Sequence, residues 1–301
     1  MWLFIDGVYT MKIKISLLVI VLLFINLPSN SKNIDKSLYR TPNADNLLYL
    51  ELDIGLIIIE MNPLFAPKHV AQIKKLARND FYNGLTFYRV IDGFVAQAGT
   101  SLDEDNGHKG FEIKNKSLQL PIESRVTNTV NKPFTLVQSP DMFAAKTGFI
   151  EGFTVAKNSD DSITWLTHCP GVIGMSRNNN PNTATTDFYI VIGQAPRYLD
   201  GIMSVFGRVI YGMDIVQRIK RVNAKNNGTF TNLSEGTTIK KINVASDLPK
   251  KEQLTIMVER TNTASFRKKL IERKIRTDPF FYEKPPQLLD ICQIPVQTIL
   301  L

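Results

Sequence analysis

The residue whose surroundings most suggest chemistry is an arginine within an apolar strand pattern. Arg89 stands between Phe87 and Ile91, and at the two-residue period of a strand all three would share one face. Such a guanidinium is either a surface group that reaches out to water or a charge held against an apolar platform. A held guanidinium offers several donors and stays protonated at any working pH. It can therefore stabilise a group that becomes more basic during a reaction.

No competing catalytic group is visible in the sequence. The three histidines, His69, His108 and His168, are far apart and lack the spacing of metal ligands. The chain contains neither a Gly-x-Ser-x-Gly elbow nor a glycine-rich phosphate loop. We therefore expect no metal and no cofactor, and a reaction that needs neither.

Rotation about an X–Pro peptide bond is a reaction of this kind. Its uncatalysed barrier is about 18–20 kcal/mol because amide resonance must be broken. A catalyst needs an apolar pocket for the proline ring and a donor aimed at the twisted amide, whose nitrogen becomes more basic. Arg89 fixed above aromatic and aliphatic side chains would meet both needs.

Strands must position these side chains. Residues 86–97 predict a strand, a tight turn at Asp92-Gly93 and a second strand. A strand pair is expected at 47–61, followed by a helix that ends near Asn79. Further strands are expected at 171–177, 187–192, 205–209 and 235–244. The remaining expected elements are a short helix at 213–221, a turn-rich insertion with a few strands at about 100–166, and a terminal helix over most of 254–275.

Two blocks of the chain resemble the cyclophilin peptidyl-prolyl isomerases. The first is Phe87-Tyr-Arg89-Val-Ile-Asp-Gly-Phe94-Val-Ala-Gln97. The second begins at Gly171-Val-Ile-Gly-Met175 and continues through Asp187-Phe-Tyr189, Tyr198-Leu-Asp-Gly201 and Val205-Phe-Gly-Arg-Val209. The matching segments cover about residues 47–99 and 171–246. As a whole, the chain is similar to a larger, exported bacterial branch of the family.

This resemblance implies roles for individual residues. Arg89 corresponds to the catalytic arginine, Gln97 to the glutamine that orients it, and Tyr189 to the phenylalanine of the pocket floor. The substrate-holding asparagine corresponds to Asn178, with Arg177 as the alternative. The substrate-binding positions are Phe87, Ile91, Phe94, Val95, Gln97, Asn178, Asp187, Tyr189, Leu199 and Met203.

Several positions depart from the family's best-studied pattern. Tyr88 replaces a histidine, which we expect to be tolerated because that side chain is peripheral to the arginine. Asp187 replaces a glutamine and would either pair with Arg89 or shift the charge at the rim. Tyr189 brings a hydroxyl that needs a partner, and Met203 replaces a histidine, which would lower the rate. The other departures are Val95 for methionine and Tyr198 for tryptophan.

The expected fold is mainly β. Alternating strands with two helical segments suit a closed antiparallel β-barrel capped by two helices, and the resemblance implies eight strands. We expect a polar leader at 32–46, the barrel domain at 47–248 with an insertion at about 100–170, and a C-terminal helix and tail at 249–301.

The N-terminus predicts export. Lys12 and Lys14 precede an apolar stretch at 15–27 and a small polar segment, which is the pattern of a secretory signal peptide over residues 1–31, with Met11 as the true start. The stretch is shorter than the roughly 20 residues of a membrane span. We expect a periplasmic or secreted protein; the alternative is an uncleaved anchor that faces the periplasm.

The two cysteines, Cys169 and Cys292, leave two possibilities open. In an oxidising compartment they can form one disulfide, which would tie the tail to the middle of the chain. Otherwise both are buried free thiols.

The leading functional hypothesis is an isomerase that assists protein folding in the periplasm. Its partners would be proline-containing segments of unfolded or partly folded proteins, and we expect a monomer. Lys and Arg are spread along the chain, at a net charge of +8, so nucleic acid is not an expected partner. The alternatives are a non-catalytic proline-peptide-binding chaperone and a structural envelope protein.

Overall fold

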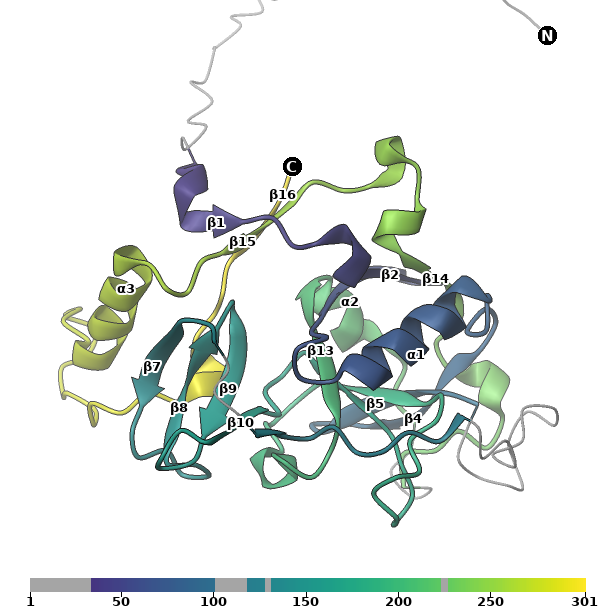
Figure 1. Cartoon of the computed structure of the whole chain (residues 1–301), viewed down its shortest axis with the longest axis horizontal. Helices are drawn as coiled ribbons and strands as arrows, with labels where there is room; N and C mark the ends of the chain where they lie inside the picture. Colours follow the sequence, from purple (N-terminus) through teal and green to yellow (C-terminus); the bar gives the residue numbers. More distant parts are fainter. Residues whose placement is uncertain (1–33, 101–117, 128–130, 223–226) are drawn as a thin grey trace, which may run out of the picture. The chain divides into compact units, whose positions relative to one another are not determined.

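The computed structural model describes residues 34–100, 118–127, 131–222 and 227–301 (Figure 1). Asp35 to Leu301 cluster as one unit. The expected signal peptide at 1–31 and His108 lie outside the described residues. Within the described ranges, no helix has the length and hydropathy that a membrane crossing requires.

An eight-stranded antiparallel sheet forms the centre of this unit. Its order is β14-β2-β3-β13-β11-β12-β5-β4. The strands are β2 (Leu47–Leu52), β3 (Gly55–Met61), β4 (Thr86–Ile91), β5 (Val95–Gly99), β11 (Val172–Met175), β12 (Phe188–Val191), β13 (Val205–Tyr211) and β14 (Ile239–Val244).

The expected closed barrel is not confirmed, because the sheet is an open half-barrel. The edge strands β4 and β14 share no ladder. They meet at one end, where Thr86 forms an isolated bridge with Thr238, the N–H of Phe87 donates to the carbonyl of Thr237, and the N–H of Ile239 donates to the carbonyl of Leu85. A loop takes most of the outer hydrogen bonds of β4 instead. The N–H of Val90 donates to the carbonyl of Gly228, and the N–H of Phe230 donates to the carbonyl of Tyr88.

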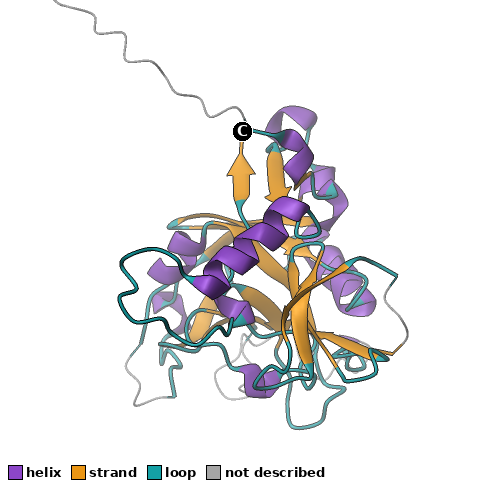
Figure 2. Cartoon of the chain, turned by 90° about the vertical axis from the view of Figure 1, so that its left-hand side faces the viewer, coloured by secondary structure: helices purple, strands orange, loops and turns teal. Residues whose placement is uncertain are grey.

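The main core lies between the sheet and helix α1 (Pro67–Arg78). Val70, Ile73 and Leu76 of α1 are buried against the strands, as their spacing along the helix predicts. The two expected helices of the barrel domain and the expected C-terminal helix are all present, as three α-helices that flank the strands (Figure 2). The other two are α2 (Met213–Arg218) and α3 (Ala264–Ile275).

The insertion forms a sheet of its own, with the order β6-β10-β9-β8-β7. Its strands are β6 (Val126–Thr127), β7 (Phe134–Gln138), β8 (Lys146–Ile150), β9 (Phe153–Lys157) and β10 (Ile163–Leu166). Phe149 and Val155 of this sheet share a second apolar core with Phe266 of α3 and with Val95 and Tyr189 of the central sheet. The insertion therefore packs behind strands that carry expected site residues.

The chain ends form a third small sheet, in which β15 (Ile256–Glu259) lies between β1 (Tyr39–Arg40) and β16 (Thr298–Leu300). The terminal helix is shorter than expected. The apolar run at 256–258 is buried as a strand, and α3 begins only after Thr263, whose hydroxyl accepts the N–H of Phe266. Short 3₁₀ helices lie at Lys36–Leu38, Ala44–Asn46, Arg197–Leu199, Leu233–Glu235, Ala245–Asp247, Lys250–Glu252 and Ile291–Gln293.

Cys169 and Cys292 form a disulfide, with their Cα atoms 4.9 Å apart. The possibility of two free thiols is therefore not realised. The bond ties the tail beyond α3 to the segment between β10 and β11.

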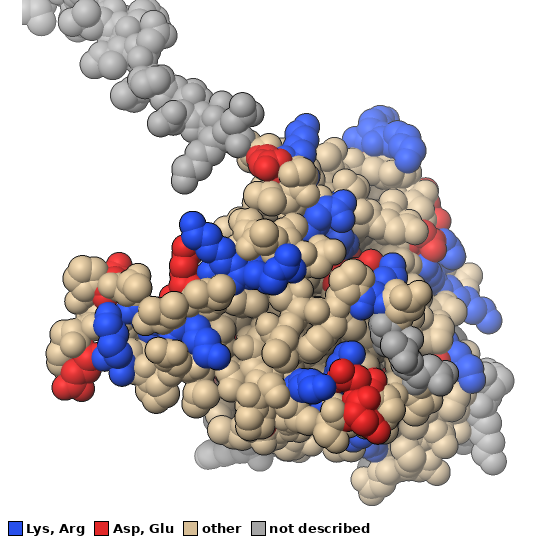
Figure 3. All heavy atoms as spheres, turned by 60° about the vertical axis from the view of Figure 1, so that its left-hand side comes forward, with Lys and Arg blue, Asp and Glu red and all other residues tan. Residues whose placement is uncertain are grey.

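Charges of both signs share the surface. On the face shown in Figure 3, Lys and Arg lie among Asp and Glu rather than in one continuous basic patch.

Candidate active site

A pocket of about 440 Å³ opens on the side of β4 and β5 that faces away from the main core. Seven expected site residues line it: Arg89, Phe94, Val95, Gln97, Tyr189, Leu199 and Met203. Five further residues complete the lining: Tyr88, Ser176, Arg177, Asn227 and Thr229.

A β-bulge in β4 determines which side chains reach the pocket. Thr86 pairs with Gly99 but Arg89 pairs with Gln97, so β4 has one residue more than β5 in this interval. Phe87 consequently points into the main core, where it is fully buried, and does not share a face with Arg89. Its expected place in the pocket wall is wrong for this reason. The bulge brings Tyr88 to the pocket instead.

The guanidinium of Arg89 is held in place. One terminal nitrogen donates to Oε1 of Gln97 at 3.0 Å, and Nε donates to the carbonyl of Asn227 at 3.3 Å. No carboxylate pairs with it among the described residues, and partial burial lowers the pKa of Arg89 from its usual value. Its remaining donors are available to a ligand.

Asp187 does not lie at the rim and does not pair with Arg89, contrary to both expectations. Its side chain is fully buried beneath the pocket. Oδ2 accepts the hydroxyl of Tyr88 at 2.8 Å, while Oδ1 accepts the N–H of Thr100 at 2.9 Å and the hydroxyl of Thr186 at 2.9 Å. Burial raises the pKa of the Asp187 carboxyl, and these hydrogen bonds oppose that rise.

Tyr88 connects this buried carboxyl to the arginine. Its hydroxyl oxygen accepts a hydrogen bond from the amide nitrogen of Gln97, and the amide oxygen of Gln97 contacts Arg89. Tyr88 is therefore not peripheral to the arginine, although its position in the family pattern led us to expect this. Asp187, Tyr88, Gln97 and Arg89 form one continuous chain of hydrogen bonds.

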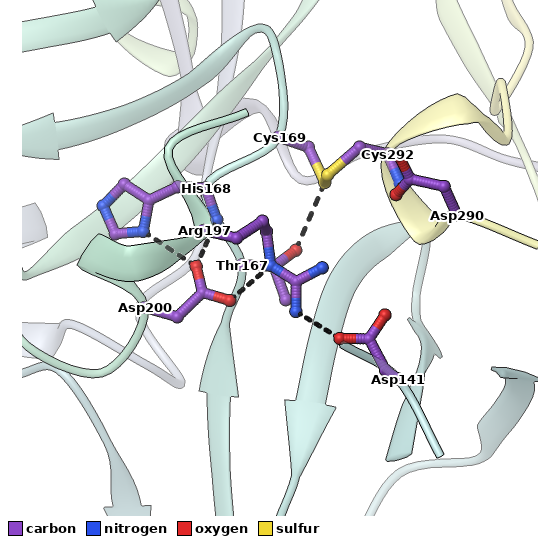
Figure 4. The surroundings of a disulfide bond; sticks show 8 residues. All are labelled: Asp141, Thr167, His168, Cys169, Arg197, Asp200, Asp290 and Cys292. Carbon is purple, nitrogen blue, oxygen red and sulfur yellow. Dashed lines mark hydrogen bonds and ion pairs between the residues drawn. A yellow bond between two sulfur atoms is a disulfide. The ribbon is translucent and has the colours of Figure 1, made fainter. Parts of the chain in front are cut away.

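A second buried network supports the pocket floor. The hydroxyl of Tyr189 lies 2.9 Å from Nε2 of His168. Nδ1 of His168 lies 3.1 Å from Oδ1 of Asp200 (Figure 4). Arg197 pairs with Asp200 and donates to Asp141 at 3.0 Å. Burial raises the pKa of Tyr189, so the hydroxyl stays neutral. His168 is the partner that the Tyr189 hydroxyl was expected to need.

Glycine makes room for that hydroxyl. A Cβ at Gly174 would lie 2.4 Å from the hydroxyl oxygen of Tyr189. The adjacent strand can therefore pass close to the tyrosine only where it has no side chain.

The remaining expected residues lie outside the pocket. Ile91 is half-buried on β4 and does not line the cavity. Asn178 is exposed, and its N–H donates to the hydroxyl of Thr183. Arg177, the alternative to Asn178, lines the pocket and donates to the carbonyl of Ile202 at 3.1 Å.

Some lining residues gave no signal in the sequence. Asn227 and Thr229 belong to the loop that covers the outer edge of β4, and no local pattern predicts that contact. Ser176, which directly follows β11, also lines the pocket without having been expected there, and Arg177 was expected only as the alternative to Asn178. Across the described ranges, no three His, Cys, Asp or Glu side chains gather as metal ligands would.

Comparison with known proteins places the chain within one family. Residues 47–244 match the family model described as cyclophilin type peptidyl-prolyl cis-trans isomerase/CLD. A probable peptidyl-prolyl cis-trans isomerase of Brucella suis is 34% identical over 190 residues, which cover 63% of this chain and 79% of the relative. A peptidyl-prolyl cis-trans isomerase of Acinetobacter baylyi is 27% identical over 215 residues, which cover 67% and 89%.

The similarity also extends to the parts that flank the family match. The crystal structure of a cyclophilin from Hirschia baltica has a TM-score of 0.69 to this chain at 26% identity, and the match covers 87% of this chain and 93% of that chain. Residues 47–244 are only about two thirds of the sequence. The structural match therefore includes residues of the N-terminal or C-terminal extension.

Proposed function

Because the chain belongs to the cyclophilin-type peptidyl-prolyl cis-trans isomerases, we propose that Arg89 is the residue through which it accelerates rotation about X–Pro bonds. The observation that carries this proposal is the position of Arg89. Gln97 fixes its guanidinium at the wall of an apolar pocket, and no carboxylate neutralises it among the described residues.

The pocket suits a proline ring. Phe94, Leu199 and Met203 provide apolar wall surface, and the ring of Tyr189 lies at the floor with its hydroxyl turned to His168. Burial of a ring there removes apolar surface from water and places the X–Pro bond beside Arg89. The polar rim at Ser176 and Arg177 would contact the backbone of the flanking peptide.

Arg89 would act on the twisted amide. As the C–N bond rotates, resonance is lost and the proline nitrogen regains its lone pair. A guanidinium donor aimed at that nitrogen interacts more strongly with the twisted state than with either planar isomer, which is the requirement for catalysis. A hydrogen bond to a charged group contributes about 1.5–3 kcal/mol, or roughly 10- to 150-fold in rate.

The proposed substrates are proline-containing segments of unfolded or partly folded proteins in an oxidising compartment. The Cys169–Cys292 disulfide supports this location, since disulfides persist mainly outside the cytosol. The signal-peptide pattern at 1–31 supports it as well. Fractionation of cells that express the full chain tests the location. A periplasmic product that lacks residues 1–31 is expected, and a cytoplasmic product with an intact N-terminus contradicts export.

The decisive experiment measures isomerisation of a proline peptide by wild type, Arg89→Ala and Arg89→Lys. We expect Arg89→Ala to lower kcat/KM by about 10- to 150-fold, the factor that one hydrogen bond to a charged group corresponds to. Lysine should restore little of it, because it lacks the planar fork. Arg218→Ala, which removes an exposed arginine of α2, is the matched control and should leave the rate unchanged.

Each negative result has its own meaning. A wild type that binds the peptide without accelerating its isomerisation would favour the non-catalytic chaperone. Full activity of Arg89→Ala would remove the arginine from the mechanism while leaving the family assignment intact.

A further inference from the structure

We propose that Asp187 is a positioning residue for Arg89, and that it acts by fixing the direction of every hydrogen bond in the chain Asp187–Tyr88–Gln97–Arg89. The inference rests on the proposed role of Arg89. It adds a residue that touches neither the pocket nor the substrate, because Asp187 is fully buried below the pocket.

The direction begins at the carboxylate, which can only accept hydrogen bonds. Oδ1 of Asp187 is already occupied by the N–H of Thr100 and by the hydroxyls of Thr100 and Thr186. Oδ2 is left for Tyr88, 2.8 Å away. The single hydroxyl hydrogen of Tyr88 must therefore point to Asp187.

The same constraint passes from Tyr88 to Gln97. With its hydrogen used, the hydroxyl oxygen of Tyr88 can only accept, so the amide group of Gln97 must turn its nitrogen toward it. The amide oxygen of Gln97 then faces Arg89 and accepts its guanidinium at 3.0 Å. In the reverse orientation two donors would face each other in a partly buried site, and Arg89 would lose its support.

The backbone around Asp187 is built for this burial. Gly99 of β5 has φ of +137°, and a Cβ there would lie 2.2 Å from Oδ1 of Asp187. The bulge between Thr86 and Arg89 is equally necessary, because it turns Tyr88 toward Gln97. The glycine and the bulge thus both support the same chain of hydrogen bonds.

Asp187→Asn tests the direction with almost no change of shape. The N–H of Thr100 still requires an acceptor, so the new amide keeps its oxygen there and turns its NH₂ to Tyr88. Tyr88 then accepts from residue 187 and donates to Gln97, whose amide flips and presents NH₂ to Arg89. We expect kcat/KM to fall about tenfold or more.

A second substitution should restore the activity. Gln97→Glu supplies a carboxylate that can accept from both Tyr88 and Arg89, and therefore fits the reversed chain. In the wild-type background Tyr88 donates its hydrogen to Asp187. A carboxylate at residue 97 would then face the hydroxyl oxygen of Tyr88 with no hydrogen between them, so Gln97→Glu alone should lower the rate. Each single variant is expected to lose activity and the double variant to recover most of it.

If the activity losses of the two single variants do not add up in the double variant, Asp187 acts on the position of Arg89 and not through the stability of the whole protein. Thermal unfolding midpoints of all variants are measured beside the kinetics. The proposal is overturned if the kcat/KM losses of the two single variants multiply in the double variant. It is also overturned if Asp187→Asn is as active as wild type. If Asp187→Asn does not fold, Tyr88→Phe replaces it, because it breaks the chain while Asp187 keeps its bonds to Thr100 and Thr186.

The two proposals fail in different ways. An inactive wild type contradicts the proposed function. The hydrogen-bond chain from Asp187 to Arg89 can then still be tested by side-chain NMR. The resonances of the Gln97 amide and the Arg89 guanidinium should then shift together in Asp187→Asn and return in the double variant. Unchanged resonances in Asp187→Asn would show that Asp187 does not set the direction of the hydrogen bonds to Arg89.

Discussion

The hydroxyl of Tyr189 and Nε2 of His168 lie 2.9 Å apart, and both side chains are buried. Asp200 can only accept from the other ring nitrogen of His168, so in the neutral imidazole Nε2 is the acceptor. The tyrosine therefore donates its hydrogen away from the pocket. This arrangement keeps a polar atom at the floor without offering a polar surface to a proline ring.

Tyr189→Phe should separate stability from catalysis. It keeps the ring that lines the floor but leaves Nε2 of His168 without a partner, which costs about 1–3 kcal/mol of unfolding free energy. We expect kcat/KM to change less than about threefold. Urea unfolding and the peptide assay measure the two effects. A large loss of rate at unchanged stability would show that the hydroxyl contacts the substrate.

His168→Leu completes the test, because it leaves the hydroxyl of Tyr189 without its hydrogen-bond partner, whereas Tyr189→Phe leaves the imidazole without one. In the Tyr189→Phe background it should cost less than in wild type, since the two groups satisfy each other. Equal costs in both backgrounds would contradict the pairing.

Glu123 should stabilise helix α1 although it lies in the insertion. The helix has no side-chain cap at Ala66, and the Glu123 carboxylate accepts the N–H groups of Lys68 and His69 at 3.0–3.1 Å. A carboxylate at a helix N-terminus satisfies free donors and complements the helix dipole. Glu123→Ala should therefore lower the unfolding free energy by about 1–2 kcal/mol, and Glu123→Gln by less. Equal stability of wild type and Glu123→Ala in urea would show that the cap is unimportant.

The fold was largely predictable where the signal is local. The period of α1 and the strand patterns at 47–61 and 86–97 depend on neighbouring residues only. The bulge in β4 was not predictable, because register depends on the partner strand, and its consequence was the wrong placement of Phe87. The open edge of the sheet likewise depends on a loop more than 130 residues away along the chain.

In the candidate site too, local signals were predictive and contacts between distant parts of the chain were not. The strand pattern singled out Arg89, the family resemblance added Gln97 and Tyr189, and all three line the pocket. The burial of Asp187 was missed because it arises from contacts with Thr100 and Tyr88, which are 87 and 99 positions away in the sequence. The family position of Asp187 suggested either a pair with Arg89 or a charge at the rim, and buried aspartates are rare unless they are paired.

His69 should make stability depend on pH. Its side chain is fully buried, and burial lowers its pKa below the unfolded value of about 6.5, although Glu123 partly opposes this. Between the two pKa values the unfolded chain binds more protons than the folded one. Unfolding free energy should therefore fall as pH drops from about 7 through 6.5 toward the folded pKa, and this loss should level off below it.

The matched variant for this dependence is His69→Asn. Asparagine can place a donor near the position of Nδ1, which contacts Glu123 at 2.7 Å, but it does not titrate between pH 5 and 7. Its urea midpoint should vary less with pH than that of wild type over this interval. An identical slope in both proteins would assign the dependence to other groups.

Reduction of the Cys169–Cys292 disulfide should destabilise the whole described unit, because the bond closes a long loop. The two cysteines are 123 positions apart, and loops near 100 residues correspond to about 4–5 kcal/mol in the chain-entropy account. The tail also contributes Leu289 and Ile291 to the apolar core that includes Tyr189, so its release should loosen the pocket floor as well.

Urea unfolding with and without reductant measures the loss of stability, and the peptide assay measures the effect on the pocket. The double variant Cys169→Ala/Cys292→Ala is the control: it should resemble the reduced wild type and be insensitive to reductant. Wild-type stability and activity that reductant leaves unchanged, after thiol titration confirms that the bond is open, would show that packing alone holds the tail.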